Sequence, residues 1–372
     1  MFRRLTANTL ILVLGNGGSA LLAFLLVISL ARGLGSADFG RYASIMALVL
    51  PLTLLADAGL ATLLTREIAR DRSQTMAYLA QAVRLRLWVA GGLVGVVWLV
   101  AGWLFRDAAS VTGLRLAALM ILIDTLFGVY TALWRAWETM LPITLLNWGL
   151  LGGQVCVSVL ILSRGGGLVT VLAGLVAVDA LQLLLAWLWW RWQHPPQPPA
   201  LPLPTGQSLL RVALPFAVGG VLAMLQLRSF TLVVQAIAGA EVTGWFAAAY
   251  RFLEAVRLPP LALFVALFPA VAALSWNDDA LRRLTWRMGL LVLGYGLLSG
   301  MALILLGAWL VERLLGPAYT QAGQLLPILG LASLPFLLRQ LIMTLLYARG
   351  GEADANRRLA LSLPCKPCSP PR

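Results

Sequence analysis

Long, continuous apolar stretches alternate with short polar segments along most of the chain. Most stretches reach about 20 residues, the length that a helix needs to cross roughly 30 Å of hydrocarbon. Polarity does not alternate from one residue to the next, as it would in the strands of a membrane barrel. We therefore expect an all-α polytopic membrane protein with about ten transmembrane helices, at approximately 8–31, 42–64, 87–105, 113–133, 142–163, 168–190, 209–237, 245–274, 285–311 and 323–346.

A proline-rich segment interrupts this pattern after the sixth apolar stretch. It reads QHPPQPPALPLPTGQ, residues 193–207, and this composition is typical of an extended linker. The sequence thus predicts two lobes, of six and four helices, with a linker and a tail. The expected boundaries are 1–192 for the N-terminal lobe, 193–208 for the cytoplasmic linker, 209–346 for the C-terminal lobe and 347–372 for the cytoplasmic tail.

Composition supports a membrane protein and narrows its partners. The chain is 60% hydrophobic and 12% charged, with a mean hydropathy of +0.87, which excludes an ordinary soluble domain. Its net charge of +13 would suit nucleic acid, but the arginines cluster at the ends of apolar stretches, so no nucleic acid is expected. Most of them fall on the side of the N-terminus, which the positive-inside rule places in the cytoplasm. The three cysteines, Cys156, Cys365 and Cys368, have no suitable neighbours, so we expect no metal and no cofactor.

One polar turn occurs twice. The stretch LGSADFGRYA (34–43) returns as AGAEVTGWFA (238–247), with Gly35 matching Gly239 and Gly40 matching Gly244. An even number of expected spans separates the two turns, so both hairpins run in the same direction through the membrane. This indicates a parallel internal repeat whose halves are related by an axis along the membrane normal. We expect the four glycines to form matched turns at the outer gate, although any short helical hairpin favours glycine and an acid.

The segment 30–70 closely resembles the start of the bacterial polysaccharide (O-antigen type) flippases. The matching positions there are Leu34-Gly35, Phe39-Gly40, Tyr42, Asp57, Gly59 and Arg66-Glu67, and those of the second half are Pro215, Tyr250, Arg251 and Pro269. The resemblance covers about residues 5–350. It implies the fold of the multidrug/oligosaccharidyl-lipid/polysaccharide exporter superfamily, with two helical lobes around a cavity and transport by alternating access. Members usually have twelve or fourteen spans, so the resemblance also raises the expectation of an incomplete C-terminal lobe.

Several ionisable residues fall inside the expected spans, where charge is costly and frequently functional. Arg228 and Glu254 lie at equal distances from the second turn, so we expect them at the same depth and able to pair, either for structure or for function. Arg251, Glu254 and Arg257 follow a spacing of three and share one helix face. If Arg228 takes Glu254, two arginines remain for an anion, since guanidinium groups bind phosphate in bidentate fashion. Alternatively, Arg251 reaches outward and Arg257 pairs with Asp124 or Asp179.

Three acids complete the set of candidate residues. Asp124 and Asp179 are expected near the middle of their helices, and Asp57 closer to the cytoplasm. A buried carboxylate can carry a proton or bind Na⁺, so these acids could couple transport to an ion gradient. Each could equally serve to neutralise an arginine.

These observations favour a transporter rather than an enzyme. The resemblance implies a flippase that moves a polyprenyl-diphosphate-linked oligosaccharide across the bacterial inner membrane, with membrane lipids and the polymerase and glycosyltransferases of the pathway as further partners. The alternatives are a membrane glycosyltransferase or polymerase, a cation-drug exporter of the same superfamily, and a truncated inactive flippase. Short outer loops argue against the first, and the arginines argue against the second.

Overall fold

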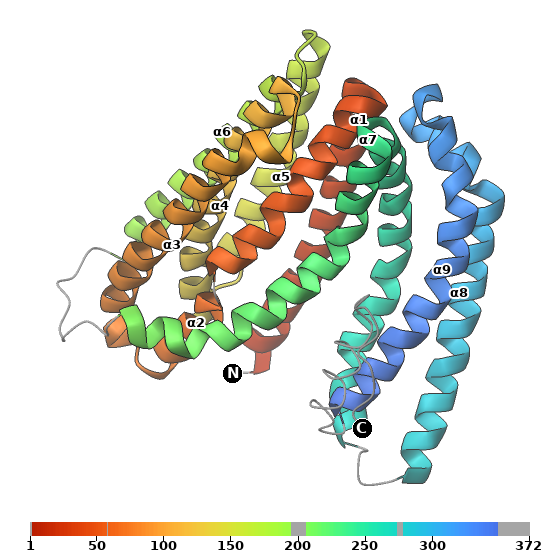
Figure 1. Cartoon of the computed structure of the whole chain (residues 1–372). Helices are drawn as coiled ribbons and strands as arrows, with labels where there is room; N and C mark the ends of the chain where they lie inside the picture. Colours follow the sequence, from red (N-terminus) through yellow and green to blue (C-terminus); the bar gives the residue numbers. More distant parts are fainter. Residues whose placement is uncertain (1, 58, 195–205, 274–277, 349–372) are drawn as a thin grey trace, which may run out of the picture. The chain divides into compact units, whose positions relative to one another are not determined.

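The computed structural model describes residues 2–57, 59–194, 206–273 and 278–348, and all of its regular elements are helices (Figure 1). Their bounds are α1 (Phe2–Asp57), α2 (Leu60–Arg70), η1 (Arg72–Gln74), α3 (Thr75–Leu104), α4 (Ala108–Ala136), α5 (Leu141–Ser163), α6 (Leu168–Gln193), α7 (Gly206–Ala273), α8 (Asp278–Leu315), η2 (Pro317–Tyr319) and α9 (Thr320–Ala348).

Within the described ranges, eight helices are long and apolar enough to cross a membrane. The expectation of an all-α polytopic membrane protein is therefore confirmed. The linker expected over 193–208 falls mostly on residues 195–205, and the tail expected over 347–372 falls mostly on residues 349–372. Both segments lie outside the described residues.

The first helix is a hairpin. A straight helix of 56 residues would be about 84 Å long, far more than one membrane crossing requires. The backbone breaks at Gly35, with φ 75° and ψ 174°, and the helix turns back on itself. The same break occurs in α7 at Gly239, with φ 80° and ψ −176°. Only glycine adopts this conformation readily, so the same backbone conformation explains the glycine at both matched positions.

The chain divides into two compact units, residues 1–244 and 245–372. In the first unit, α4 lies at the centre and packs against α1, α3 and α6, while α5 packs against α1 and α6. A core forms near one end of these helices around Trp134, which is fully buried and stacks edge-on against Trp189 and Trp190. The short helix α2 covers this core with Leu64 and Ile68, while its charged residues remain on the other face.

The second unit consists of the end of α7 together with α8 and α9, which pack closely along their lengths. At Gly300 and Gly330, a Cβ on either residue would meet the backbone of the other at about 3 Å. Such small residues allow two helices of a membrane protein to approach closely. Phe264, Val292 and Leu337 form the apolar core beside this crossing.

Candidate functional site

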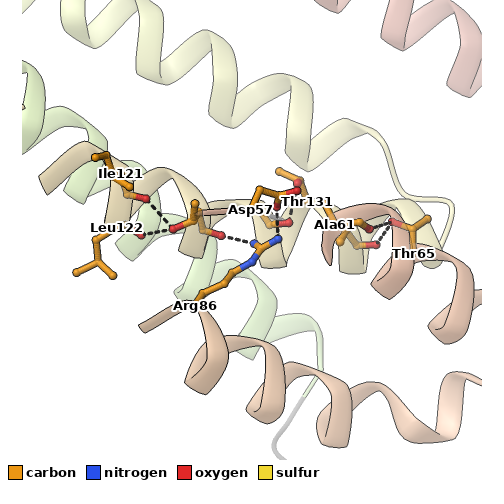
Figure 2. A network of polar contacts seen from close by, with 10 residues as sticks. Asp57, Ala61, Thr65, Arg86, Ile121, Leu122 and Thr131 are labelled. Atoms are coloured by element: carbon orange, nitrogen blue, oxygen red, sulfur yellow. Dashed lines mark hydrogen bonds and ion pairs between the residues drawn. The ribbon is translucent and has the colours of Figure 1, made fainter. Parts of the chain in front are cut away.

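A buried ion pair joins α1 and α3 (Figure 2). Asp57 is the last residue of α1, where a carboxylate is unfavourable beside the negative end of the helix dipole. The Arg86 guanidinium of α3 compensates this charge: Nη2 donates to the Asp57 carboxylate and Nη1 donates to the carbonyl of Thr125 in α4. The Arg86 side chain is fully buried, whereas that of Asp57 is 22% exposed. One arginine thus ties three helices together.

Two glycines make room for this pair. Gly59 has a left-handed backbone, with φ 72° and ψ 5°, and starts α2 directly after the end of α1. Gly128 of α4 faces the guanidinium, and an added Cβ would lie 2.9 Å from Nη1 of Arg86. The Asp-x-Gly pattern of Asp57 and Gly59 therefore combines a charged helix end with the residue that lets the chain turn away from it.

Arg86 lies one residue before the apolar stretch that the sequence predicts to begin at residue 87. The structure starts α3 twelve residues earlier, at Thr75, so Arg86 lies within the helix. The signal was present in the spacing, since Ala82, Arg86 and Ala90 recur every four residues and are all fully buried.

A second polar cluster lies deeper in the first unit. Asp179 of α6 is buried and accepts a hydrogen bond of 2.7 Å from Nε2 of Gln154 in α5. Asp124 of α4 is close enough for its charge to act on Asp179. Within the described residues, Asp124 has no hydrogen-bond or ion-pair partner. The two acids expected near mid-helix therefore lie on neighbouring helices, close enough to interact electrostatically.

In the second unit, the three residues expected on one helix face divide into a pair and a single arginine. Nη1 of Arg251 lies 2.7 Å from the Glu254 carboxylate. Arg257 is buried, and its Nη1 donates to the Tyr250 hydroxyl at 3.2 Å. Its guanidinium also lies 3.7 Å from the ring centre of Phe336 in α9, a cation–π contact.

Arg257 therefore differs from the other buried arginine, Arg86. No carboxylate of the described residues lies within ion-pairing distance of Arg257, whose charge contacts the Tyr250 hydroxyl and the rings of Tyr250 and Phe336. Arg228 is half-buried on α7 in the first unit. Its expected pairing with Glu254 would join the two units and stays a prediction.

The two matched turns contact each other within the first unit. An added Cβ on Gly40 would overlap the carbonyl oxygen of Ala240, and one on Gly244 would overlap the carbonyl oxygen of Ser36. Ser36 also donates to Glu241 at 3.4 Å. The contact is reciprocal, since each turn offers a glycine to the backbone of the other.

A hydrogen bond extends this contact along the helices. The buried Ser44 hydroxyl of α1 donates to Oε1 of Gln235 in α7 at 2.8 Å. The two turns are therefore joined by close backbone contact at two glycines and by a buried hydrogen bond.

The sequence pattern of the polysaccharide biosynthesis protein family matches residues 5–275. No match was found among proteins of curated function.

Solved structures with a similar fold are transporters. An inward-facing multidrug resistance MATE family transporter of the MOP superfamily is 15% identical, with a TM-score of 0.78, and the alignment covers 93% of this chain and 84% of that one. An outward-facing transporter of the same description gives 16% identity and a TM-score of 0.62 over 96% and 83% of the two chains. The Vibrio cholerae MATE transporter VcmN in the bent form gives 16% identity and a TM-score of 0.60 over 96% and 86%. These likenesses show that the chain has the MOP transporter fold over most of its length.

Proposed function

Because the chain belongs to the polysaccharide biosynthesis protein family, we propose that it is a flippase for a polyprenyl-diphosphate-linked oligosaccharide. It moves the glycan head group from the cytoplasmic to the periplasmic side of the bacterial inner membrane. No covalent chemistry is required, in keeping with the MOP transporter fold. The prenyl tail stays in lipid while the charged diphosphate and the sugars cross inside the protein.

The observation that carries this proposal is the environment of Arg257. A buried guanidinium without a carboxylate among the described residues is costly unless an anion joins it. Tyr250 and Phe336 hold the side chain in place but leave its charge uncompensated. A diphosphate supplies the missing charge and accepts several guanidinium hydrogen bonds. In this proposal Arg251 is the second ligand, since it can exchange Glu254 for the substrate.

The matched turns support alternating access. The breaks at Gly35 and Gly239 have nearly the same backbone angles and lie 204 positions apart, in keeping with two lobes related by a parallel repeat. In this proposal, the N-terminus is cytoplasmic and the junction of Gly40 and Gly244 is the outer gate. The gate opens when the lobes rock apart.

The acids of the first unit divide into two roles in this proposal. Asp57 is fully engaged by Arg86 and serves to fix three helices. Asp124 lies close enough to act electrostatically on Asp179, which accepts a hydrogen bond from Gln154, and two close carboxylates favour uptake of a proton or a cation. We assign them the coupling of transport to an ion gradient.

Export of a surface glycan tests the function. The chain is expressed in a strain that lacks its own flippase, and delivery of lipid-linked glycan to the periplasmic side is measured. We expect export to be restored and to fall at least about tenfold in Arg257→Ala, the loss expected for one charge-assisted hydrogen bond to phosphate. Arg164→Ala, at an exposed position of the first unit, is the matched control.

Other outcomes would point elsewhere. Export that does not depend on Arg257 or Arg251 would keep the flippase and remove the anion site. Failure to restore export in several glycan backgrounds, with raised resistance to cationic drugs, would favour the drug exporter. The pair of acids Asp124 and Asp179 is the feature that would serve such a cation.

A further inference from the structure

A cavity of about 580 Å³ opens in the first unit between α3 and α6. Leu79 and Val83 of α3 form one wall, Trp190 of α6 forms the other, and Tyr130 of α4 lies between them. The cavity is separate from the Asp57–Arg86 pair and from the acids of the first unit. The function proposed above does not use it.

Two arginines line this otherwise apolar cavity from opposite walls. Arg84 belongs to α3 and Arg191 to the last turn of α6. Both side chains are exposed, and neither forms an ion pair with a carboxylate of the described residues. Arg191 also contacts the ring of Trp187 at 5.4 Å. Two like charges on one cavity repel each other until an anion lies between them.

The third polar group of the cavity adds no charge of its own. His194 stacks on Trp190 with a ring distance of 4.1 Å, and burial lowers the pKa of its imidazole. The ring is therefore neutral at pH 7, and the positive charge of the cavity comes from the two arginines. An amphiphile with one anionic group and an apolar body fits this lining.

The depth of the cavity narrows the choice of ligand. Trp187 and Trp190 lie near the end of α6, where tryptophans mark the boundary between hydrocarbon and head groups. By the positive-inside rule this end faces the cytoplasm, where basic pockets between helices bind anionic lipid head groups. We propose that the cavity is a binding site for an anionic phospholipid, whose phosphate lies between Arg84 and Arg191 and whose apolar part contacts Leu79, Val83 and Tyr130.

Native mass spectrometry of the purified chain tests this site. The probes are phosphatidylglycerol and phosphatidylcholine with identical acyl chains, each added to protein in a non-ionic detergent. We expect the unmodified protein to retain phosphatidylglycerol in preference to phosphatidylcholine. The double variant Arg84→Gln/Arg191→Gln should lower the affinity for phosphatidylglycerol about tenfold or more, because each arginine near an anionic head group adds to the binding free energy.

A second double variant controls for the loss of net charge. Arg135→Gln/Arg164→Gln removes the same two charges from exposed positions outside the cavity and should keep the preference. If both double variants lose the preference for phosphatidylglycerol equally, the preference depends on the net charge of the protein and the proposed site is wrong. Unchanged binding in Arg84→Gln/Arg191→Gln, or equal retention of both lipids by the unmodified protein, would also overturn it. The single variants Arg84→Gln and Arg191→Gln allow the same comparison if the double variant is poorly folded.

Discussion

The charges of Asp57 and Arg86 should stabilise the protein together, so that removing both should cost less than the sum of removing each alone. The Arg86 side chain has no exposed surface, so Arg86→Gln leaves the Asp57 carboxylate and the Thr125 carbonyl without their donor. Breaking a buried ion pair from one side costs about 3–5 kcal/mol. Because Asp57 is 22% exposed and can gain some hydration, we expect a cost of about 3 kcal/mol, the lower end of this range.

A double-mutant cycle isolates the interaction. The variants are Asp57→Asn, Arg86→Gln and the two combined, and the free energy of unfolding is measured in detergent by titration with a denaturing surfactant. The combined variant has no buried charge at this position, so its cost should be well below the sum of the single costs. We expect a coupling energy of about 2 kcal/mol, within the range seen for residues in direct contact.

Arg135→Gln is the matched control for this cycle. It removes the same charge from the neighbouring helix α4, but the Arg135 side chain is exposed and has no acidic partner among the described residues. Its effect on the free energy of unfolding should stay within about 0.5 kcal/mol. Additive costs for Asp57→Asn and Arg86→Gln would refute the reasoning, because they would mean that the two charges do not stabilise each other.

Three further predictions follow from other parts of the structure. Gly40→Ala should force the two turns apart, so disulfide cross-linking between cysteines placed on the two turns should fall sharply. Gly95→Ala, where an added Cβ has open space, should leave this cross-linking unchanged. Equal cross-linking in both variants would contradict the close contact between the turns. Asp179→Asn should keep the hydrogen bond from Gln154 but abolish the dependence of transport on a proton or sodium gradient. If transport in proteoliposomes still depends on the gradient, Asp179 does not belong to the coupling site. Asp107→Ala should lower the melting temperature, because this side chain caps α4 by accepting from the Ser110 N–H, a bond worth about 1 kcal/mol.

The effect of Asp107 should also depend on pH. Partial burial opposes its ionisation, but hydrogen bonding from Ser110 and the charge of Arg41 outweigh burial and hold its pKa below the ordinary value. A depressed pKa means that this stabilisation is complete above the ordinary pKa of about 3.9 and is lost as the pH falls through the folded-state value. The difference in melting temperature between Asp107→Ala and the unmodified protein should therefore shrink in acid. A difference that stays constant below the ordinary pKa would contradict this.

Local features of the fold could be predicted from the sequence. The apolar stretches predict the helices, and Pro142 lies in the first turn of α5, where proline is favoured. The recurrence of Gly35 and Gly239 predicts two turns of one kind, because glycine is the residue that adopts a positive φ without steric cost. Their physical basis lies within a few neighbouring positions, so no knowledge of packing is needed.

Features that depend on packing between helices were harder to predict. The sequence indicates Asp57 as a candidate residue, but its partner Arg86 is 29 positions away on another helix, and no local pattern pairs the two. Glu254 contacts Arg251, one helical turn away on the same helix, and its expected pairing with Arg228 stays a prediction. The matched turns were expected, but their mutual backbone contact through Gly40 depends on how α1 lies against α7.

Pro260 also combines a local feature that the sequence predicts with a partner that only the tertiary structure supplies. Pro260 lacks the N–H that would bond the carbonyl of Val256 four residues earlier, so an unsatisfied acceptor could be predicted there. The structure supplies the donor from another helix, since the Tyr295 hydroxyl of α8 donates to the Val256 carbonyl at 2.7 Å. The acceptor is a local property of the sequence, whereas the identity of the donor depends on tertiary structure.

Direct observation of lipid translocation tests the central claim. The purified chain is reconstituted into liposomes that carry a fluorescent polyprenyl-diphosphate oligosaccharide in both leaflets, and a membrane-impermeant reagent destroys the fluorophore in the outer leaflet. A flippase makes almost all of the label accessible within the assay, and Arg257→Ala should slow this step at least about tenfold. The test requires a folded chain and both a proton and a sodium gradient across the liposome membrane. If only about half of the fluorescent label is accessible to the reagent, as in protein-free liposomes, the proposed function is wrong.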